Sequence, residues 1–356
     1  MTKKITQQQI ADRLQLSRNT VSKALNNEPG LKEETRDRII KQAIEMGYTK
    51  FPPELLDTIQ AHHLNEQSSL QSKSIDNPLI ALLTHSDYVG NHYWSIFMKG
   101  LNTALKERGC TMAITLIDEE EENQLQLPAL FSHQKPAGIV TIGAFLQAYY
   151  ERLEQTGIPA LFVDTYANFS MNKLHTDTLL VSNEESVYEL TTSLLEQGLK
   201  EIGFIGDIGS CLSYHERWSG YQKALRDWGI AINPEINIVN QLPRHYYRRP
   251  ELEQALQEMK RLPQAFICAN DEIAVEMMQL LRAAGMRVPE DIILTGFDQI
   301  GELAFLHSSI PTVEVPKEEM GLRAGEQLLW RMAHPDRPKE LIRLGVKIHK
   351  HPPTHM

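Results

Sequence analysis

Apolar and polar residues follow two different patterns along this chain. In residues 6–46 the apolar positions recur every three or four residues, the spacing of helices with one buried face. From residue 78 onward, short apolar runs alternate with amphipathic helical segments, a pattern typical of a parallel sheet covered by helices. Residues 65–77 between them are poor in apolar side chains and indicate a flexible linker. The pattern therefore predicts a small helical module, a linker and an α/β body.

Three helices are expected in the N-terminal module. Thr6 and Gln9 form a capping-box pattern, so the first helix starts there, and Ser17 caps a second helix. The buried stripe of this second helix consists of Val21, Ala24 and Leu25. A third helix, from about residue 32 to 46, ends before Gly47 and completes the small core.

The second helix presents hydrogen-bonding side chains at its start. Arg18, Asn19 and Lys23 face outward there, and in the major groove Arg matches guanine while Asn matches adenine by paired hydrogen bonds. Helix pairs with a polar outer face also occur in proteins that do not bind DNA, so this stretch alone leaves both interpretations open.

The charge distribution favours DNA binding. Residues 1–50 contain ten Lys and Arg against six Asp and Glu, a net charge of +4, whereas the whole chain carries −10. The remaining 306 residues therefore carry −14. This asymmetry fits a basic DNA-binding module attached to an acidic body.

Length and composition narrow the classes further. At 356 residues the chain is too long for one ordinary core, and its 42% hydrophobic and 23% charged content is typical of globular proteins. No run of about 18 apolar residues and no secretory signal is present, so we expect no membrane association and a cytoplasmic protein. The three cysteines, which are far apart and lack metal-ligand spacing, suit a reducing compartment; they are Cys110, Cys211 and Cys268.

The order of these N-terminal features resembles the DNA-binding headpiece of the LacI/GalR family of bacterial transcription regulators. The match lies in residues 10–27 (IADRLQLSRNTVSKALNN) and 34–48 (ETRDRIIKQAIEMGY). The resemblance implies that Arg18, Asn19 and Lys23 read bases of double-stranded operator DNA. Backbone-positioning roles would fall on Thr6, Ser17, Thr20, Ser22 and Asn26. It also implies a homodimer, whose two headpieces read the half-sites of a near-palindromic operator.

The segment after the headpiece departs from the family. Members usually have a short hinge helix with a Pro-Asn start and a Leu that wedges into the minor groove. Residues 49–77 of this chain lack the Pro-Asn pair, although Pro52 and Pro53 precede residues that can start a helix. Leu55 or Leu56 is the candidate wedge. The domain prediction is therefore a headpiece at 1–48, a linker with an atypical hinge at 49–77, and a body at 78–356.

The body reads as two successive β-α-β series, which predicts two Rossmann-like subdomains with parallel sheets and a cleft between them. The expected strands are 78–84, 110–117, 137–143, 158–164 and 179–183, followed by 201–207, 236–240, 264–270 and 291–297. The expected helices are 94–106, one around 123–131, one ending at Gly157, 184–197, 216–228 and 251–261.

The second part of the body also resembles the effector-binding body of the family, which is related to periplasmic sugar-binding proteins. The similarity lies in residues 214–225, 263–300 and 310–329. It implies chain crossings near 181–183, 312–315 and 318–323. Subdomain one would span about 78–181 plus 313–320, and subdomain two about 183–311 plus the C-terminal segment.

Ligands of open α/β sheets bind beyond the carboxyl ends of the strands, and polar residues follow several of the expected strands. The candidate effector-binding residues are His85, Asp87, Tyr93, Trp94, Asp164, Arg217, Asn270 and Asp298. The family resemblance implies contacts from Arg217, Asn270, Asp298 and one of the two aromatic residues. Carboxylates accept from vicinal hydroxyls, Arg donates paired hydrogen bonds and an aromatic ring covers an apolar sugar face.

Structural roles remain open for some of these residues. Arg217 and Asp298 form a salt bridge in the alternative interpretation, and Asn270 caps the following helix. This chain departs from the family at Asn183, where members often have Asp. The predicted effector is a sugar or sugar derivative, and the alternative is a purine or nucleoside acting as corepressor.

Other features indicate no chemistry. Glu119–Glu122 is expected to be a solvated loop, and the histidines near the linker and the C-terminus lack metal-ligand spacing. No P-loop, GxGxxG or GxSxG motif is present, and no pair of groups can be given acid and base roles. We therefore expect no enzyme activity, catalytic residue, metal or cofactor. The C-terminus has no heptad segment, so no coiled-coil tetramer is expected. The prediction is a ligand-responsive repressor of a carbohydrate-use operon.

Overall fold

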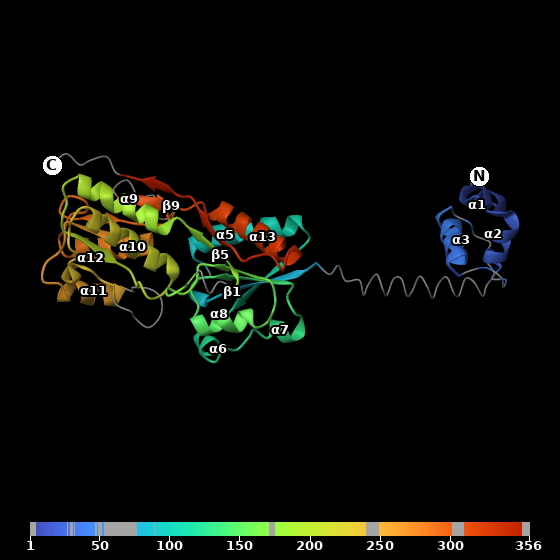
Figure 1. Cartoon of the computed structure of the whole chain (residues 1–356), viewed down its shortest axis with the longest axis horizontal. Helices are drawn as coiled ribbons and strands as arrows, with labels where there is room; N and C mark the ends of the chain where they lie inside the picture. Colours follow the sequence, from blue (N-terminus) through green and yellow to red (C-terminus); the bar gives the residue numbers. More distant parts are fainter. Residues whose placement is uncertain are drawn as a thin grey trace. The chain divides into compact units, whose positions relative to one another are not determined.

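The computed structural model of this chain divides into two compact units, Met1–Asp76 and Asn77–Met356 (Figure 1). It describes residues 5–26, 28, 31, 33–46, 48, 52, 77–88, 90–170, 175–239, 249–300 and 310–350. The candidate wedge residues Leu55 and Leu56 lie outside the described residues. No described helix has the length and apolar character needed to cross a membrane.

The headpiece consists of three helices, α1 (Gln7–Leu14), α2 (Arg18–Leu25) and α3 (Glu33–Glu45). The predicted capping box is confirmed, because the Thr6 hydroxyl accepts from the Gln9 amide and the Gln9 side chain accepts from the Thr6 amide. Ser17 caps α2 as predicted, and Gln15 ends α1 with a φ of 56°. The core is formed by Ile10, Ala11, Val21, Ala24, Leu25, Ile39, Ala43 and Tyr48.

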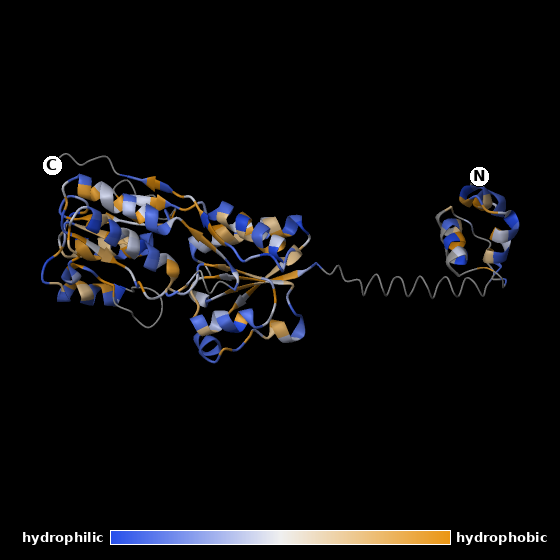
Figure 2. Ribbon diagram, in the orientation of Figure 1, coloured by the Kyte–Doolittle hydropathy of each residue, from blue (hydrophilic) through white to orange (hydrophobic). Residues whose placement is uncertain are grey.

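The first sheet of the body is parallel and has the strand order β10-β5-β4-β3-β1-β2. Its strands are β1 (Leu79–Thr84), β2 (Thr111–Leu116), β3 (Gly138–Ile142), β4 (Ala160–Val163), β5 (Asp177–Val181) and β10 (Leu341–Leu344). The strands of the body are mostly hydrophobic (Figure 2). The inner strands β3 and β4 are buried along their length, whereas β2 at the edge is partly exposed. The continuous apolar runs of the inner strands reflect their position between two layers of helices.

Helices cover both faces of this sheet (Figure 1). On one face lie α5 (His92–Glu107) and α13 (Lys317–Ala333), packed against Ile80 and Leu82. On the other lie α6 (Glu119–Asn123), α7 (Leu130–His133) and α8 (Gln147–Glu154), next to Ala81 and Leu83. A short 3-10 helix, η1 (Ser86–Tyr88), follows β1.

The second sheet has the parallel order β6-β7-β8. Its elements are α9 (Asn183–Glu196), β6 (Ile202–Ile205), α10 (Leu212–Asp227), η3 (Pro234–Ile236), α11 (Arg249–Glu258), β7 (Ala265–Cys268), α12 (Asp271–Ala283) and β8 (Ile293–Thr295). An antiparallel pair, β9 (Thr312–Glu314) and β11 (Lys347–His349), completes this half of the body. The predicted α/β class with two parallel sheets is confirmed.

Three expectations about local structure are wrong. The helix expected around 123–131 is two short helices, because Leu125 has a φ of 55° and Pro128 precedes α7. Glu119–Glu122 is not a solvated loop but helix α6, whose Glu122 is fully buried. The strand expected at 236–240 is only a bridge at Ile238, because the Asn237 side chain accepts the Phe204 amide that a strand would have bound.

The chain crosses between the two halves of the body three times. It passes from β5 to α9, returns between β9 and α13, and passes again between β10 and β11. The third crossing expected at 318–323 is wrong, because those residues lie inside α13, which packs closely along α5. A Cβ on Gly100 would lie 2.0 Å from the Glu318 carbonyl oxygen. Subdomain one is therefore 79–181 plus 317–344, and subdomain two is 183–314 plus 347–349.

Candidate functional site

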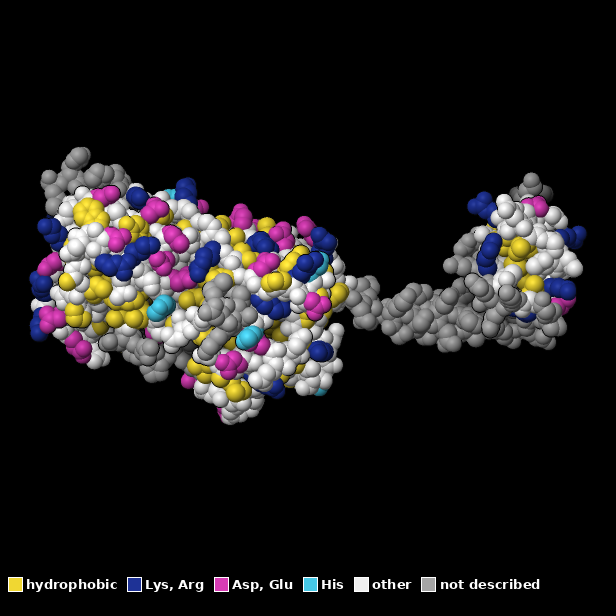
Figure 3. All heavy atoms as spheres, viewed as in Figure 1, with side chains coloured by type: hydrophobic (Ala, Val, Ile, Leu, Met, Phe, Trp, Pro, Cys, Tyr) yellow, Lys and Arg dark blue, Asp and Glu magenta, His cyan; other side chains and the backbone are white. Residues whose placement is uncertain are grey.

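The start of α2 exposes the residues expected to read bases. Arg18 and Asn19 are exposed and Lys23 is half-buried. None of the three makes a side-chain hydrogen bond or ion pair with another residue that the structure describes in the headpiece. Lys and Arg side chains stand out from the headpiece surface in Figure 3. These donors are therefore available to an external acceptor.

The positions expected to contact the DNA backbone make local bonds. The Ser17 hydroxyl accepts from the Thr20 amide at 3.1 Å and lies 2.7 Å from the Thr20 hydroxyl. Asn26 Nδ2 donates to the Ser22 hydroxyl at 3.4 Å. These bonds hold the two ends of α2 and orient its outer face. They also leave second lone pairs and donors on the hydroxyl groups for phosphate contacts.

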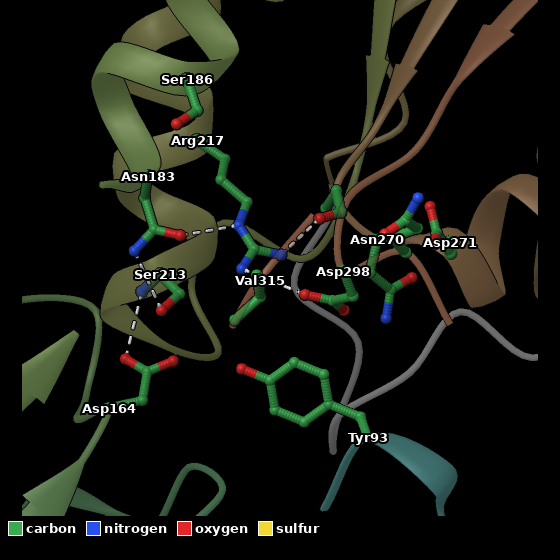
Figure 4. Close-up of polar contacts among 12 residues, drawn as sticks. Tyr93, Asp164, Asn183, Ser186, Ser213, Arg217, Asn270, Asp271, Asp298 and Val315 are labelled. Atoms are coloured by element: carbon green, nitrogen blue, oxygen red, sulfur yellow. Dashed lines mark hydrogen bonds and ion pairs between the residues drawn. The ribbon is translucent and has the colours of Figure 1, made fainter. Parts of the chain in front are cut away.

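A cavity of about 100 Å³ lies between the two subdomains of the body. It sits beyond the carboxyl ends of β4, β7 and β8, where ligands of such sheets bind. The polar and aromatic lining residues from subdomain one are Tyr88, Asn91, Tyr93, Trp94 and Asp164. Those from subdomain two include Ser210, Ser213, Tyr214, Arg217, Asn270, Glu272 and Asp298. Figure 4 shows how the central side chains converge.

Arg217, on α10, is the guanidinium that lines this cavity. Its Nε donates to Asn183 Oδ1 at 2.9 Å and its Nη1 donates to the Ala269 carbonyl oxygen at 2.6 Å (Figure 4). Its Nη2 lies 3.8 Å from Asp298 Oδ1, and Phe297 lies under the guanidinium at 3.6 Å. Arg217 is thus held rigidly, and Nη2 is the nitrogen directed toward the carboxylate in the cavity.

Asp298 is an ionisable group under strain. Its backbone φ is 105°, a conformation that residues other than glycine rarely adopt. Burial raises the pKa of its carboxyl to about 7, and Arg217 opposes that rise only in part. The side chain keeps 17% of its surface exposed, toward the cavity. Lys317 of subdomain one donates to the carbonyl oxygens of Asp298 and Gln299, which fixes the strained backbone.

Asp164 connects the two walls of the cavity. It follows β4 with a φ of 69°, and its Oδ1 accepts from the Thr165 amide at 2.7 Å and from the Ser213 amide of α10 at 3.2 Å. Burial raises the pKa of its carboxyl as well. A second contact across the cleft joins Asn91 Nδ2 to Glu272 Oε1 at 2.6 Å. Both contacts place a carboxylate at the subdomain boundary.

Aromatic rings form another wall. Tyr93 and Trp94, in the first turn of α5, meet edge to face with centroids 4.8 Å apart. The Tyr93 hydroxyl donates to Met320 Sδ at 3.6 Å, and its ring faces the carboxylates in Figure 4. Burial and the charge of Asp298 raise the pKa of the Tyr93 hydroxyl, so this group remains protonated.

Similar proteins match the chain from the headpiece to the end of the body. The family model described as a periplasmic binding protein-like domain matches residues 191–350. The "Probable HTH-type transcriptional repressor ExuR" of Bacillus subtilis (strain 168) is 25% identical over 346 residues, covering 95% of both chains. The "HTH-type transcriptional repressor CytR" of Escherichia coli (strain K12) is 25% identical over 330 residues, covering 92% of this chain and 89% of the relative. The chain belongs to the LacI/GalR family.

Solved structures agree on the fold. The "transcriptional regulator CelR-cellobiose complex" superposes with a TM-score of 0.66 at 18% identity, covering 98% of this chain and 99% of the other. The Lac repressor bound to ONPG gives 0.64 at 19% identity with the same coverage. The chain therefore shares the fold of these structures, a small helical region followed by a periplasmic-binding-protein-like body with parallel sheets. As a LacI/GalR protein it is a helix-turn-helix transcription regulator.

The structure brings together most of the cleft residues expected in this LacI/GalR chain. Six of them line the cavity, namely Tyr93, Trp94, Asp164, Arg217, Asn270 and Asp298. Asn270 has both roles that the sequence left open, because it lines the cavity and its Oδ1 accepts from the Ile273 amide at the start of α12. Arg217 and Asp298 also form the salt bridge of the alternative interpretation, although the distance from Arg217 Nη2 to Asp298 Oδ1 is long, at 3.8 Å.

His85 does not line the cavity. It continues the alternation of Ala81 and Leu83, so its ring lies on the opposite face of the sheet, 4.3 Å from the Phe145 ring. Its Nε2 lies 3.0 Å from Glu122 Oε2. For Asp87, only the backbone in η1 is described, and its side chain lies outside the described part.

Sequence reasoning missed several lining residues. Asn91 is the N-cap of α5, and Ser213 and Tyr214 lie in the first turn of α10. Helix starts that face a cleft carry such residues, so an Asn before the amphipathic stretch at 94–106 was a usable signal. Glu272 and Met320 lie on helices and have no local pattern that distinguishes them from surface or core positions.

Proposed function

We propose that this chain is a homodimeric repressor of a carbohydrate-use operon, controlled by a neutral sugar bound in the cavity between its subdomains. The domain assignment is a DNA-reading headpiece at 1–48, a linker at 49–77 and an effector-binding body from 78. The protein acts in the cytoplasm, where its operator lies. Sugar binding favours one setting of the subdomains and so changes operator affinity.

The headpiece reads the operator through α2. Arg18 and Asn19 are exposed at the helix start with unused donors, and Lys23 lies one turn further along. We assign the bases to these three residues and the phosphates to Thr6, Ser17, Thr20, Ser22 and Asn26. The local net charge of +4 supports this assignment, because phosphate neutralisation supplies much of the affinity for DNA.

The observation that carries the effector proposal is the composition of the cavity. The carboxylates of Asp164 and Asp298, one from each subdomain, both line the cavity near the Tyr93 ring, and Arg217 lies beside Asp298 (Figure 4). Carboxylates accept hydrogen bonds from vicinal hydroxyls, and an aromatic ring covers the C–H face of a sugar. The solved relatives named for a cellobiose complex and for bound ribose support the same ligand class.

The charge balance favours a neutral sugar over a phosphorylated or acidic one. Three acidic residues, Asp164, Glu272 and Asp298, line the cavity. Among the described lining residues, Arg217 is the basic side chain that faces them. Two of the Arg217 nitrogens already donate to Asn183 and Ala269. A phosphate or carboxylate would therefore meet three carboxylates and little unused donor capacity.

A purine or nucleoside corepressor is the second candidate. The edge-to-face rings of Tyr93 and Trp94 and the amide of Asn270 can hold a base as well as a sugar. The Asn270 oxygen already caps α12, so only its NH₂ group would serve a base. The cavity thus offers a base fewer directed contacts than it offers a polyol.

An exposed apolar edge supports a dimer. Ile114 and Leu116, on the edge strand β2, are 50% and 48% exposed. A second copy covering them would bury apolar surface and protect the unpaired strand edge.

Thermal unfolding of the full-length protein with neutral sugars, sugar phosphates, purines and nucleosides tests the effector class. We expect stabilisation by one or more neutral sugars, reaching about 2.7 kcal/mol at a hundredfold excess over Kd. Asp164→Asn and Arg217→Ala should abolish that stabilisation. Asp207→Asn is the matched control, because Asp207 is also a buried strand-end aspartate but does not line the cavity. Stabilisation only by purines would overturn the sugar proposal.

Operator binding provides the functional readout. With the stabilising sugar present, operator affinity measured by fluorescence anisotropy should change about 5- to 150-fold, the range for a coupling of about 1–3 kcal/mol. An unchanged affinity would show that the sugar binds without controlling the headpiece.

A further inference from the structure

Subdomain one contains a second cavity of about 170 Å³ on the α8 side of its sheet. Its walls come from α8, the ends of β4 and β5, and the segments that follow β4 and precede β5. None of its lining residues lines the effector cavity. It is therefore a separate space.

Aromatic rings form one wall of this second cavity. Tyr150 and Tyr166 have centroids 6.1 Å apart, and Phe169 meets Tyr166 edge to face at 6.0 Å. Such rings present negative π faces that attract cations as well as apolar groups. The wall alone would suit any flat or apolar ligand.

Two carboxylates, one helical turn apart on α8, give the same cavity a negatively charged wall. Glu151 is exposed, and Glu154 is half-buried and accepts from the Thr176 hydroxyl at 2.8 Å. Burial raises the pKa of Glu154, and the hydrogen bond from Thr176 opposes that rise most, followed by His175 and Lys339. Burial also raises the pKa of the Tyr166 hydroxyl, and both carboxylates add to the rise. The two carboxylates therefore act on the Tyr166 ring, which lines the same cavity.

A hydroxyl adds a third feature. Thr165 lines the cavity at its junction with β4. Its hydroxyl can donate or accept a hydrogen bond with a polar group of a ligand.

From this cavity, its aromatic wall, the paired carboxylates and the Thr165 hydroxyl, we propose a second small-molecule site that takes a small organic ammonium ion. The ammonium group lies between Glu154 and the rings of Tyr150 and Tyr166. A hydroxyl or amine of the ligand bonds to Thr165. This site is distinct from the sugar site, and its occupant differs from the sugar by its positive charge.

The site adjoins the effector cavity through one short segment. Asp164 faces the effector cavity, while Thr165 and Tyr166 face the second one. The Thr165 carbonyl oxygen accepts from the Leu212 amide of α10 at 2.8 Å, next to the bond from Ser213 to Asp164. An ammonium ligand would thus contact the segment that carries the cleft-bridging Asp164.

Binding of ammonium probes to the full-length protein tests the site. Thermal unfolding and calorimetry would use tetramethylammonium, choline and ethanolammonium chlorides at matched ionic strength. The neutral control is 3,3-dimethyl-1-butanol, which has the shape of choline without its charge. We expect at least one ammonium ion to bind at least tenfold more tightly than the neutral compound. Equal binding of choline and its isostere, or no binding by any ammonium ion, overturns the proposal.

Variants locate the probe. Glu154→Gln and Tyr166→Leu should each weaken ammonium binding about tenfold, whereas Tyr166→Phe, which keeps the ring, should retain it. Unfolding without ligand shows whether each variant is folded, and Tyr166→Phe still decides the case if Tyr166→Leu fails to fold. Loss of binding in Asp298→Asn together with full binding in Glu154→Gln would place the ammonium in the effector cavity and refute the second site.

Discussion

Replacing Asp298 by Asn should stabilise the body at alkaline pH. The two side chains have nearly the same shape, and Asn tolerates the positive φ of 105° at this position at least as well as Asp. The change removes only the ionisation of a carboxyl that burial disfavours. Because Asp298 has its nearest cation 3.8 Å away, the ionised form is poorly compensated in the folded protein.

The size and sign of the effect follow from the pKa. The carboxyl has an ordinary pKa of 3.8 and a folded pKa of about 7. Below pH 3.8 it is protonated in both states and has no effect. Between these values unfolding releases a proton, so stability falls as pH rises, and above about 7 the full cost applies. At about 1.4 kcal/mol per pKa unit this cost is at most about 4 kcal/mol, since part of the side chain is exposed.

The assay is thermal and urea unfolding of both proteins from pH 5 to pH 8.5. The unfolding midpoint of Asp298→Asn should exceed that of the parent protein by several degrees at pH 8.5, and the difference should shrink toward pH 5. Asp291→Asn is the control, because Arg287 lowers the pKa of Asp291 to about 2 and its effect should not vary over this range. A difference for Asp298→Asn that is constant with pH, or destabilisation at pH 8.5, would refute the reasoning.

Three further changes test other parts of the molecule. Arg18→Ala should weaken operator binding by about 1–3 kcal/mol and relax the preference at one base pair, measured by anisotropy on operator variants; unchanged selectivity would remove Arg18 from base reading. Glu122→Ala removes a fully buried partner of His85 and the Leu146 amide, and should cost about 3–5 kcal/mol in urea unfolding, whereas the exposed Glu120→Ala should cost less than about 0.5 kcal/mol. Gly100→Ala should cost about 1–3 kcal/mol or more, because its Cβ would meet the α13 backbone; an unaffected midpoint would contradict the close packing of α5 on α13.

The cost of ionised Asp298 to folding is consistent with a role in ligand binding. A carboxylate that lowers stability at neutral pH has no benefit for the unliganded fold. A ligand whose hydroxyls donate to it would favour the ionised form and offset part of its burial cost. If Asp298→Asn stabilises the protein and abolishes the sugar response together, the two results would locate a function at a strained, destabilising position.

Local patterns were sufficient for the headpiece. The Thr6 and Ser17 caps and the apolar spacing of the helices depend on residues within one or two turns. The strands of the body were also readable, because a strand covered on both faces must be apolar along its length. Residues following strands were the correct place to look for the cavity, since parallel strands end at the same edge.

Errors arose where a distant residue decides the outcome. Glu122 reads as one of four surface carboxylates, yet it is buried because His85 and the Leu146 amide, far along the chain, meet it there. The strand at 236–240 is limited to a bridge because a side chain, Asn237, takes the place of a backbone partner. Residues 318–323 were expected to cross between the subdomains, yet they lie inside α13, which packs on α5, an element more than 200 residues earlier in the chain.

By itself, the sequence determined the order of elements, the headpiece with its exposed Arg18 and Asn19, and the strand-end residues from which a binding site is built. Tertiary structure alone decided which of those residues meet. Asp164 and Ser213 are neighbours only because the fold places the end of β4 next to the start of α10. Asp298 has a pKa of about 7 only because the surrounding residues exclude water from its carboxyl. Local sequence sets backbone preference and apolar spacing, whereas burial and charge pairing depend on contacts between residues that are far apart in the chain.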